Sequence, residues 1–141
     1  MIYYELKIEQ GDNVIEITED NAIDFADVTI DTLNNDTQKK SNALLARMTI
    51  QGKIDSSIND RLIKISEWAR DLKNESTYRK VTLTVKEDPV TVLRTYEIPD
   101  MFVCDYSETY RSPKDENGDG SFFELNLTQK ENKLKEFNTY I

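Results

Sequence analysis

The chain has 141 residues and a mass of 16.4 kDa, which suits one domain with a sizeable core, and we expect a single domain over residues 1–141. Eighteen basic residues against 27 acidic ones give a formal charge of −9. This charge repels phosphate backbones, so we expect no nucleic-acid partner. The single cysteine, Cys104, excludes an internal disulfide, and its place in the apolar run Met101-Phe102-Val103-Cys104 predicts a buried small side chain. The absence of histidine removes the usual general base and the commonest zinc ligand.

The first residues resemble neither a signal peptide nor a membrane anchor. Met1-Ile2-Tyr3-Tyr4-Glu5-Leu6-Lys7 lacks a basic start followed by an apolar run, and no stretch approaches the roughly 18 apolar residues of a membrane span. We therefore expect a protein that is cytoplasmic as synthesised, without membrane insertion.

The first third of the chain predicts strands around a long polar loop. Apolar and polar residues alternate over 2–9, Gly11-Asp12-Asn13 is typical of a turn, and 14–18 continue the alternation, which predicts an N-terminal β-hairpin. Residues 25–30 indicate a short strand. Residues 34–42 are polar throughout and predict an exposed loop.

A strand and then a helix follow. Residues 46–54 return to apolar spacing, and Asp55-Ser56-Ser57 offers oxygens that can cap a helix. An apolar residue then recurs every three or four positions, which predicts one α-helix at about 58–73. The residues expected to face the core are Ile58, Leu62, Ile65, Ala69 and Leu72. Trp68 lies close to this stripe and is expected to pack in the core or at its edge.

The second half of the chain has the period of β-strands. Residues 81–85 alternate cleanly, Glu87-Asp88-Pro89 predicts a turn, and 90–98 predict the partner strand. Pro99 cannot donate to a ladder and therefore marks a bulge, a bend or a strand start before extended structure resumes at 101–106.

The last segments complete a β-rich pattern. Residues 112–120 are polar and turn-forming, and Phe123, Leu125 and Leu127 lie on one face of a further strand. The tail 130–141 fits a short helix or a docking strand. We therefore expect a mainly β fold, an antiparallel β-barrel or a two-sheet sandwich with a single α-helix.

No residue pattern indicates catalysis, a cofactor or a metal, and we predict that the chain is not an enzyme. Residues 115–120 match the first six positions of a calcium-binding loop, but the glutamate required at position 12 is Asn126. Aspartate, asparagine and glycine are also the usual residues of turns. We therefore predict a turn here, with calcium as the less favoured interpretation.

Taken together, these segments resemble the tail-tube superfamily, which includes the haemolysin-coregulated protein of type VI secretion and the tube proteins of contractile phage tails. The motifs that carry the resemblance are the strand Met48-Thr49-Ile50-Gln51-Gly52-Lys53-Ile54-Asp55, the helix from Ser57 to Leu72, the strand Val81-Thr82-Leu83-Thr84-Val85, the run Thr95-Tyr96-Glu97-Ile98-Pro99-Asp100-Met101-Phe102-Val103-Cys104-Asp105-Tyr106-Ser107, and the final strand from Ser121 to Thr128.

The resemblance implies a β-barrel with one helix that closes into hexameric rings, which stack into a tube. It implies that residues 31–42 form a loop that packs on the neighbouring ring. It also implies partners among sheath, spike or cargo proteins, and export within an assembled apparatus. The alternative is a monomeric β-barrel that binds calcium or a small ligand.

Apolar residues flank the polar run and are the expected contacts between subunits. They are Val28, Ile30, Leu33, Leu44 and Leu45. A free loop of this composition buries too little surface to offset its ordering entropy. We therefore expect region 27–45 to be poorly ordered in the isolated subunit and to make contacts between subunits.

Overall fold

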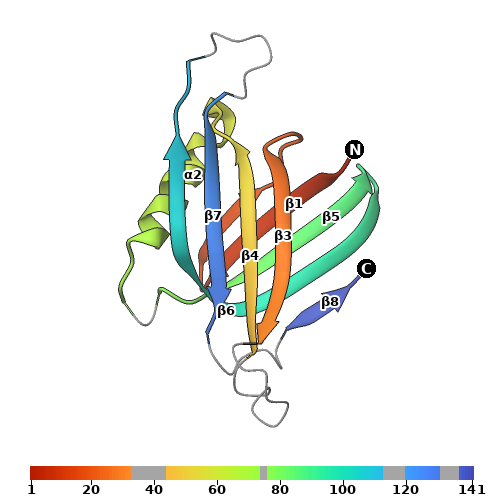
Figure 1. The fold of residues 1–141 in the computed structure, drawn as a ribbon, viewed down its shortest axis with the longest axis vertical. Helices are drawn as coiled ribbons and strands as arrows, with labels where there is room; N and C mark the ends of the chain where they lie inside the picture. Colours follow the sequence, from red (N-terminus) through yellow and green to blue (C-terminus); the bar gives the residue numbers. More distant parts are fainter. Residues whose placement is uncertain (33–43, 74–75, 113–119, 131–136) are drawn as a thin grey trace.

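Eight strands and one α-helix make up the part of the chain that the structure, a computed structural model, describes: residues 1–32, 44–73, 76–112, 120–130 and 137–141 (Figure 1). The elements are β1 (Tyr3–Gln10), β2 (Asn13–Ile17), β3 (Ile23–Thr32), β4 (Leu44–Lys53), a 3₁₀ turn (Ser56–Ile58), α2 (Asn59–Ala69), β5 (Arg79–Asp88), β6 (Thr91–Thr109), β7 (Phe122–Gln129) and β8 (Asn138–Tyr140).

All described strands belong to one antiparallel sheet in the order β2-β1-β5-β6-β7-β4-β3, with β8 added at β6. The sheet folds over itself, so that β7, β4 and β3 cross in front of β1 and β5 (Figure 1). Its two end strands, β2 and β3, do not pair with each other. The predicted mainly β fold with one helix is therefore confirmed, as an open two-layered sheet and not a closed barrel.

Strand β6 belongs to both layers because it bends in the middle. Its first half pairs with β5 and its second half, from Met101, pairs with β7. Pro99 lies at the bend, and Asp100 adopts a positive φ of 55°, which aspartate tolerates better than most residues. The Gln129 amide donates to the Pro99 carbonyl over 3.1 Å and supports the bend. The predicted irregularity at Pro99 is confirmed.

The core lies between the two layers and under the helix. Alternate residues of the strands point into it, as half-buried strands require. In β7 the buried apolar residues are Phe123, Leu125 and Leu127, as the alternation predicts, and Gln129 continues the buried face. Helix α2 contributes Leu62, Ile65 and Trp68.

Helix α2 is shorter than the sequence predicts. The Asp55 carboxylate accepts a hydrogen bond from the Ser57 amide and caps the 3₁₀ turn that leads into the helix. The helix ends at Ala69, after which Asp71 accepts hydrogen bonds from the Lys73 amide and the Ser76 hydroxyl. Such local bonds compete with helical ones.

The prediction that Leu72 faces the core is therefore wrong, since its side chain is 93% exposed. Ala69 is half-buried, and Ile58, Leu62 and Ile65 are buried as predicted. Trp68, expected in the core or at its edge, is buried and is the last core residue that the helix contributes.

Other segments refine the predictions. The short strand expected at 25–30 is the ten-residue β3, which pairs with β4 from Ile23 to Thr32. Residues 27–32 and 44–45 are thus strand, and the expectation of poor order there is wrong. The polar loop over 34–42 and residues 115–119 of the calcium-like turn lie outside the described residues. The C-terminal tail contains the docking strand β8.

Gly52 marks a close approach of three chain segments. A β-carbon at this position would lie 2.2 Å from the Ala22 carbonyl oxygen and 2.7 Å from the Phe123 ring. We expect Gly52→Ala to lower the free energy of unfolding by about 1–3 kcal/mol because backbone atoms must shift. Urea denaturation measures this loss. Gly120→Ala is the matched control, since its β-carbon meets nothing within 4 Å, and equal losses in both variants would contradict the packing described.

Candidate assembly interface

Four strands form a local sheet with two free edges. In order they are the second half of β6, β7, β4 and β3, and each neighbouring pair is antiparallel. Among the described residues, no strand pairs with the outer edge of β3 or with the outer edge of β6 over 102–109. Because direction alternates across four strands, these two edge strands run in opposite directions.

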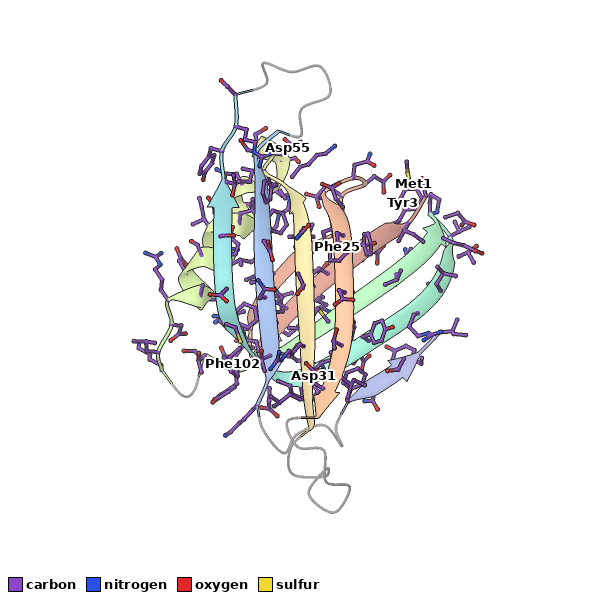
Figure 2. The ribbon with its side chains drawn as sticks, in the orientation of Figure 1. Met1, Tyr3, Phe25, Asp31, Asp55 and Phe102 are labelled. Carbon is purple, nitrogen blue, oxygen red and sulfur yellow. The ribbon has the colours of Figure 1, made fainter. Side chains whose placement is uncertain are left out.

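The free edge of β3 is long and carries exposed apolar residues. Ile30 is 55% exposed although it lies opposite Ala46, a core residue, because nothing described covers the edge. Val28 is half-buried and packs against the core. Phe25 is 45% exposed on the other face of the strand (Figure 2).

The second half of β6 is ordered by its pairing with β7. Tyr106 lies opposite Leu125, and its hydroxyl donates to Glu108 over 2.7 Å. Burial and this hydrogen bond raise the pKa of Tyr106 far above its ordinary value, so the phenol stays neutral. The edge strand is thus held in a defined register by its pairing with β7.

The face of the four strands that points away from the core is polar. It faces the viewer in Figures 1 and 2. Side-chain bonds cross between its strands: Thr49 donates to Asn126 over 2.8 Å, and Arg47 lies 3.4 Å from Asp31. The polar residues of this face, called the polar face below, are Asp27, Thr29, Asp31, Arg47, Thr49, Gln51, Lys53, Cys104, Asp105, Ser107, Thr109, Glu124, Asn126 and Thr128, and three phenylalanines, Phe25, Phe102 and Phe122, lie near its ends.

Cys104, the only cysteine of the chain, lies on the polar face. It is exposed, and its sulfur lies 2.7 Å from the Thr128 hydroxyl. The sequence predicts a buried apolar position for it, because it follows Met101, Phe102 and Val103. That expectation is wrong, because Val103 lies opposite the buried Leu127 and faces inward, so the next residue along the strand faces outward.

The predicted inter-subunit residues occupy different places. Val28 and Ile30 lie on the free edge strand β3. Leu45 is only 8% exposed and packs within the subunit. Leu44 begins β4, but its side chain and all of Leu33 lie outside the described residues. The contact role of these five residues stays a prediction.

The predicted inter-subunit residues include none from the free edge of β6. The sequence carries one signal for it, the 19 residues from Thr91 to Thr109 that stay extended through Pro99. A strand of that length exceeds the typical ten residues, so its two halves are expected to pair with different neighbours.

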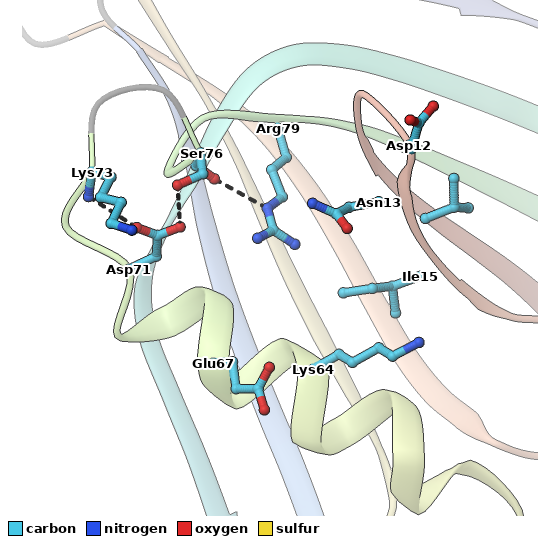
Figure 3. Close-up of a pocket in the computed structure, with 10 residues that line it drawn as sticks. Asp12, Asn13, Ile15, Lys64, Glu67, Asp71, Lys73, Ser76 and Arg79 are labelled. Carbon is cyan, nitrogen blue, oxygen red and sulfur yellow. Dashed lines mark hydrogen bonds between the residues drawn. The ribbon is translucent and has the colours of Figure 1, made fainter.

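A groove lies between helix α2 and the β1–β2 turn (Figure 3). Arg79 stands at its centre, with its Nε donating to the Ser76 carbonyl and its guanidinium 5.2 Å above the Trp68 ring. The groove holds about 510 Å³ and is lined by three cations (Lys64, Lys73, Arg79) and three carboxylates (Asp12, Glu67, Asp71). These opposite charges cancel, so the groove does not select a charged ligand.

The described residues show neither a metal-binding cluster nor a membrane-spanning helix. They contain no cluster of three side chains of the kinds that hold metals. No described helix is long and apolar enough to cross a membrane. The strongest structural feature is therefore the pair of free edges.

Comparison with known proteins shows similarity at the level of the fold. No family model and no curated protein matches the sequence. A chain of the sheath/tube terminator of an extracellular contractile injection system, PVC, superposes with a TM-score of 0.59 at 14% identity, over 99% of this chain and 94% of that one. Hcp1 from Flavobacterium johnsoniae superposes with a TM-score of 0.54 at 9% identity, over 96% and 98%. The predicted tail-tube fold is confirmed.

A third chain with the tail-tube fold comes from the baseplate of the anti-feeding prophage, whose structure is six-fold symmetrised. It superposes with a TM-score of 0.54 at 11% identity, over 98% of this chain and 92% of that one. Coverage near the full length of both partners means that the likeness includes both layers and the helix. At these identities it establishes architecture, and function rests on the geometry above.

Proposed function

We propose that this chain is a ring-forming subunit of the tube of a contractile injection apparatus. The observation that carries the proposal is the pair of free, oppositely directed edges on one four-stranded sheet. If β3 of one copy pairs with the second half of β6 of the next, every junction is antiparallel, like the pairs within the subunit. Such a head-to-tail contact between unlike surfaces generates a ring when the rotation closes.

The character of the edges supports pairing. Monomeric proteins protect exposed edges with lysine, proline, bulges or very short strands. β2, the other end of the sheet, has five residues, whereas β3 has ten and contains neither lysine nor proline. The β6 edge over 102–109 also contains neither lysine nor proline, and its one irregularity is the bulge between Val103 and Asp105. These are the edges that a partner strand can extend.

The position of the second layer indicates which face lines the ring. The layer of β1, β2 and β5, with helix α2, covers one face of the four strands and adds thickness there (Figure 1). In a closed ring the thicker side must lie at the larger radius. The polar face then lines a water-filled channel, as expected for a sheet face that carries mostly polar residues.

Six copies are supported by the fold similarity and by the size of the wall. The similar baseplate chain comes from a six-fold symmetrised structure. Four strands from each of six copies give a wall of about 24 strands, and walls of 16–18 strands already enclose an aqueous channel. We propose the same chain as partner within and between rings, with cap and sheath proteins as further partners. Nothing in the geometry assigns a catalytic step.

The natural cysteine gives a test of the channel assignment. We expect a maleimide carrying a bulky polymer to label Cys104 in the isolated subunit but not in the assembled protein, because a closed ring excludes the polymer. A small maleimide is expected to label both. The readout is the mass shift of the denatured chain after timed labelling.

A control separates channel protection from general crowding. In a Cys104→Ser background, Leu72→Cys places a thiol after the helix, where the native side chain is 93% exposed. This site lies on the outer layer and is expected to react with the bulky reagent in both states. Equal labelling of Cys104 in free and assembled protein would place the polar face outside the channel and refute the assignment.

A further inference from the structure

The C-terminal strand β8 is held to the sheet by few contacts. It pairs over three residues, Asn138–Tyr140, with Glu97, Tyr96 and Thr95 of β6. Every residue of β8 is exposed. Two side-chain contacts specify the register: the Tyr140 hydroxyl donates to Glu97, and the Phe137 ring lies edge-on to Tyr96 with centroids 6.2 Å apart.

A short exposed strand of this kind is easily released. Each of its ladder hydrogen bonds exchanges with bonds to water, so the net gain per bond is small. Ile141, which follows β8, is 83% exposed and adds almost no burial to hold the end down. Local opening of a terminal element therefore costs far less than global unfolding.

The edge of β6 that holds β8 is longer than the strand that occupies it. In the described residues, β8 pairs with 95–97 and β7 begins at Met101 on the same edge, while Thr91–Arg94 have no strand partner on that side. Leu93 within this stretch is 38% exposed. The edge thus presents a template for an extended chain, the mode of recognition in which a peptide adds a strand to a sheet.

The tether of β8 allows it to reach another copy. Seven residue steps separate Lys130, after β7, from Phe137. A chain of that length spans up to about 24 Å when extended. It can therefore place β8 either on its own β6 or on the β6 of a copy in contact with it.

We propose that the β6 edge binds the β8 strand of a second copy in place of its own, so that assembled subunits exchange C-terminal strands. Phe137 and Tyr140 of the incoming copy make the same contacts with Tyr96 and Glu97 as the native strand makes. Exchange of identical elements therefore loses no contact, which makes it a low-cost way to link copies. This edge is distinct from both free edges of the proposed ring joint, so the inference does not rest on the ring.

The concentration dependence follows from the tether. A strand joined to its own subunit by so few residues stays near its own β6 at an effective concentration on the order of millimolar. Dilute subunits are expected to keep β8 on their own β6, whereas neighbours in an assembly reach comparable local concentrations and exchange.

Cysteine pairs at one register position test the exchange. Residues paired across antiparallel strands have α-carbons about 4.5–5.5 Å apart, within the range of a disulfide. In a Cys104→Ser background, Glu97→Cys and Asn138→Cys are purified separately, mixed at rising concentration and oxidised mildly. We expect a disulfide-linked heterodimer to accumulate with concentration, identified by the 97–138 cross-linked peptide in mass spectrometry.

Two controls make each outcome decisive. The double variant with both cysteines in one chain is expected to close internally when dilute, which verifies the register. Glu16→Cys, also exposed but on β2, is mixed with Asn138→Cys to measure random collision. Failure of internal closure, or heterodimer no more abundant than the Glu16 mixture at every concentration, would overturn the proposal.

Discussion

Replacing Ile30 by lysine is expected to abolish assembly while leaving the subunit folded. Ile30 lies on the free edge of β3 and is 55% exposed, so the isolated chain can place a lysine ammonium group in water. A paired edge would bury that charge in the junction, and lysine on an edge opposes strand pairing. We expect the association constant to fall at least about tenfold, or about 1.4 kcal/mol per junction. Sedimentation velocity measures this change.

The helix provides a matched control for this variant. Ile63 is 51% exposed on α2, outside both edge strands, and Ile63→Lys adds the same charge at nearly the same exposure. It is expected to assemble like the parent. If Ile30→Lys assembled as well as Ile63→Lys, pairing at the β3 edge would be refuted.

The second large effect is expected from Trp68→Ala. Trp68 is 1% exposed, its indole N–H donates to the Thr77 carbonyl over 2.8 Å, and Arg79 stacks on its ring. Removing the side chain leaves a cavity and an unpaired carbonyl, so we expect the free energy of unfolding to fall by about 3–5 kcal/mol. Urea denaturation followed by circular dichroism measures the loss.

Leu72→Ala distinguishes the structure from the sequence pattern. The helical spacing places Leu72 in the core, whereas the structure leaves it 93% exposed after the end of α2. We expect this variant to change stability by no more than about 0.5 kcal/mol. A loss comparable with that of Trp68→Ala would show that the helix continues through Leu72 and packs it inward.

The spacing of apolar residues predicts an element correctly where the element buries one face along its whole length. The alternation of Phe123, Leu125 and Leu127 predicts their shared buried face, because β7 lies in the middle of the sheet. The helix pattern is wrong at the C-terminal end, where Asp71 accepts hydrogen bonds that stop the helix. The spacing of apolar residues carries no information about such bonds. The prediction for Cys104 fails because a continuous apolar run does not show which residues alternate outward, and Cys104 follows Val103, which faces inward opposite Leu127.

The candidate interface depends on information that is not local. β3 is an edge strand because β4 is the one strand among the described residues that pairs with it. The free half of β6 is set by the point at which β5 stops pairing. Both facts follow from contacts between residues far apart in the sequence. The resemblance to a known family does not tell which two edges can join, and the strand order does.

The most direct test of edge-to-edge ring closure is the mass of the assembled protein. Native mass spectrometry, or light scattering after size-exclusion chromatography, is performed over a wide concentration range. Edge-to-edge ring closure predicts a discrete species at six times the 16.4 kDa subunit mass, or multiples of it where rings stack. It also predicts that Ile30→Lys removes this species. A protein that stays monomeric up to high concentration would contradict edge-to-edge ring closure.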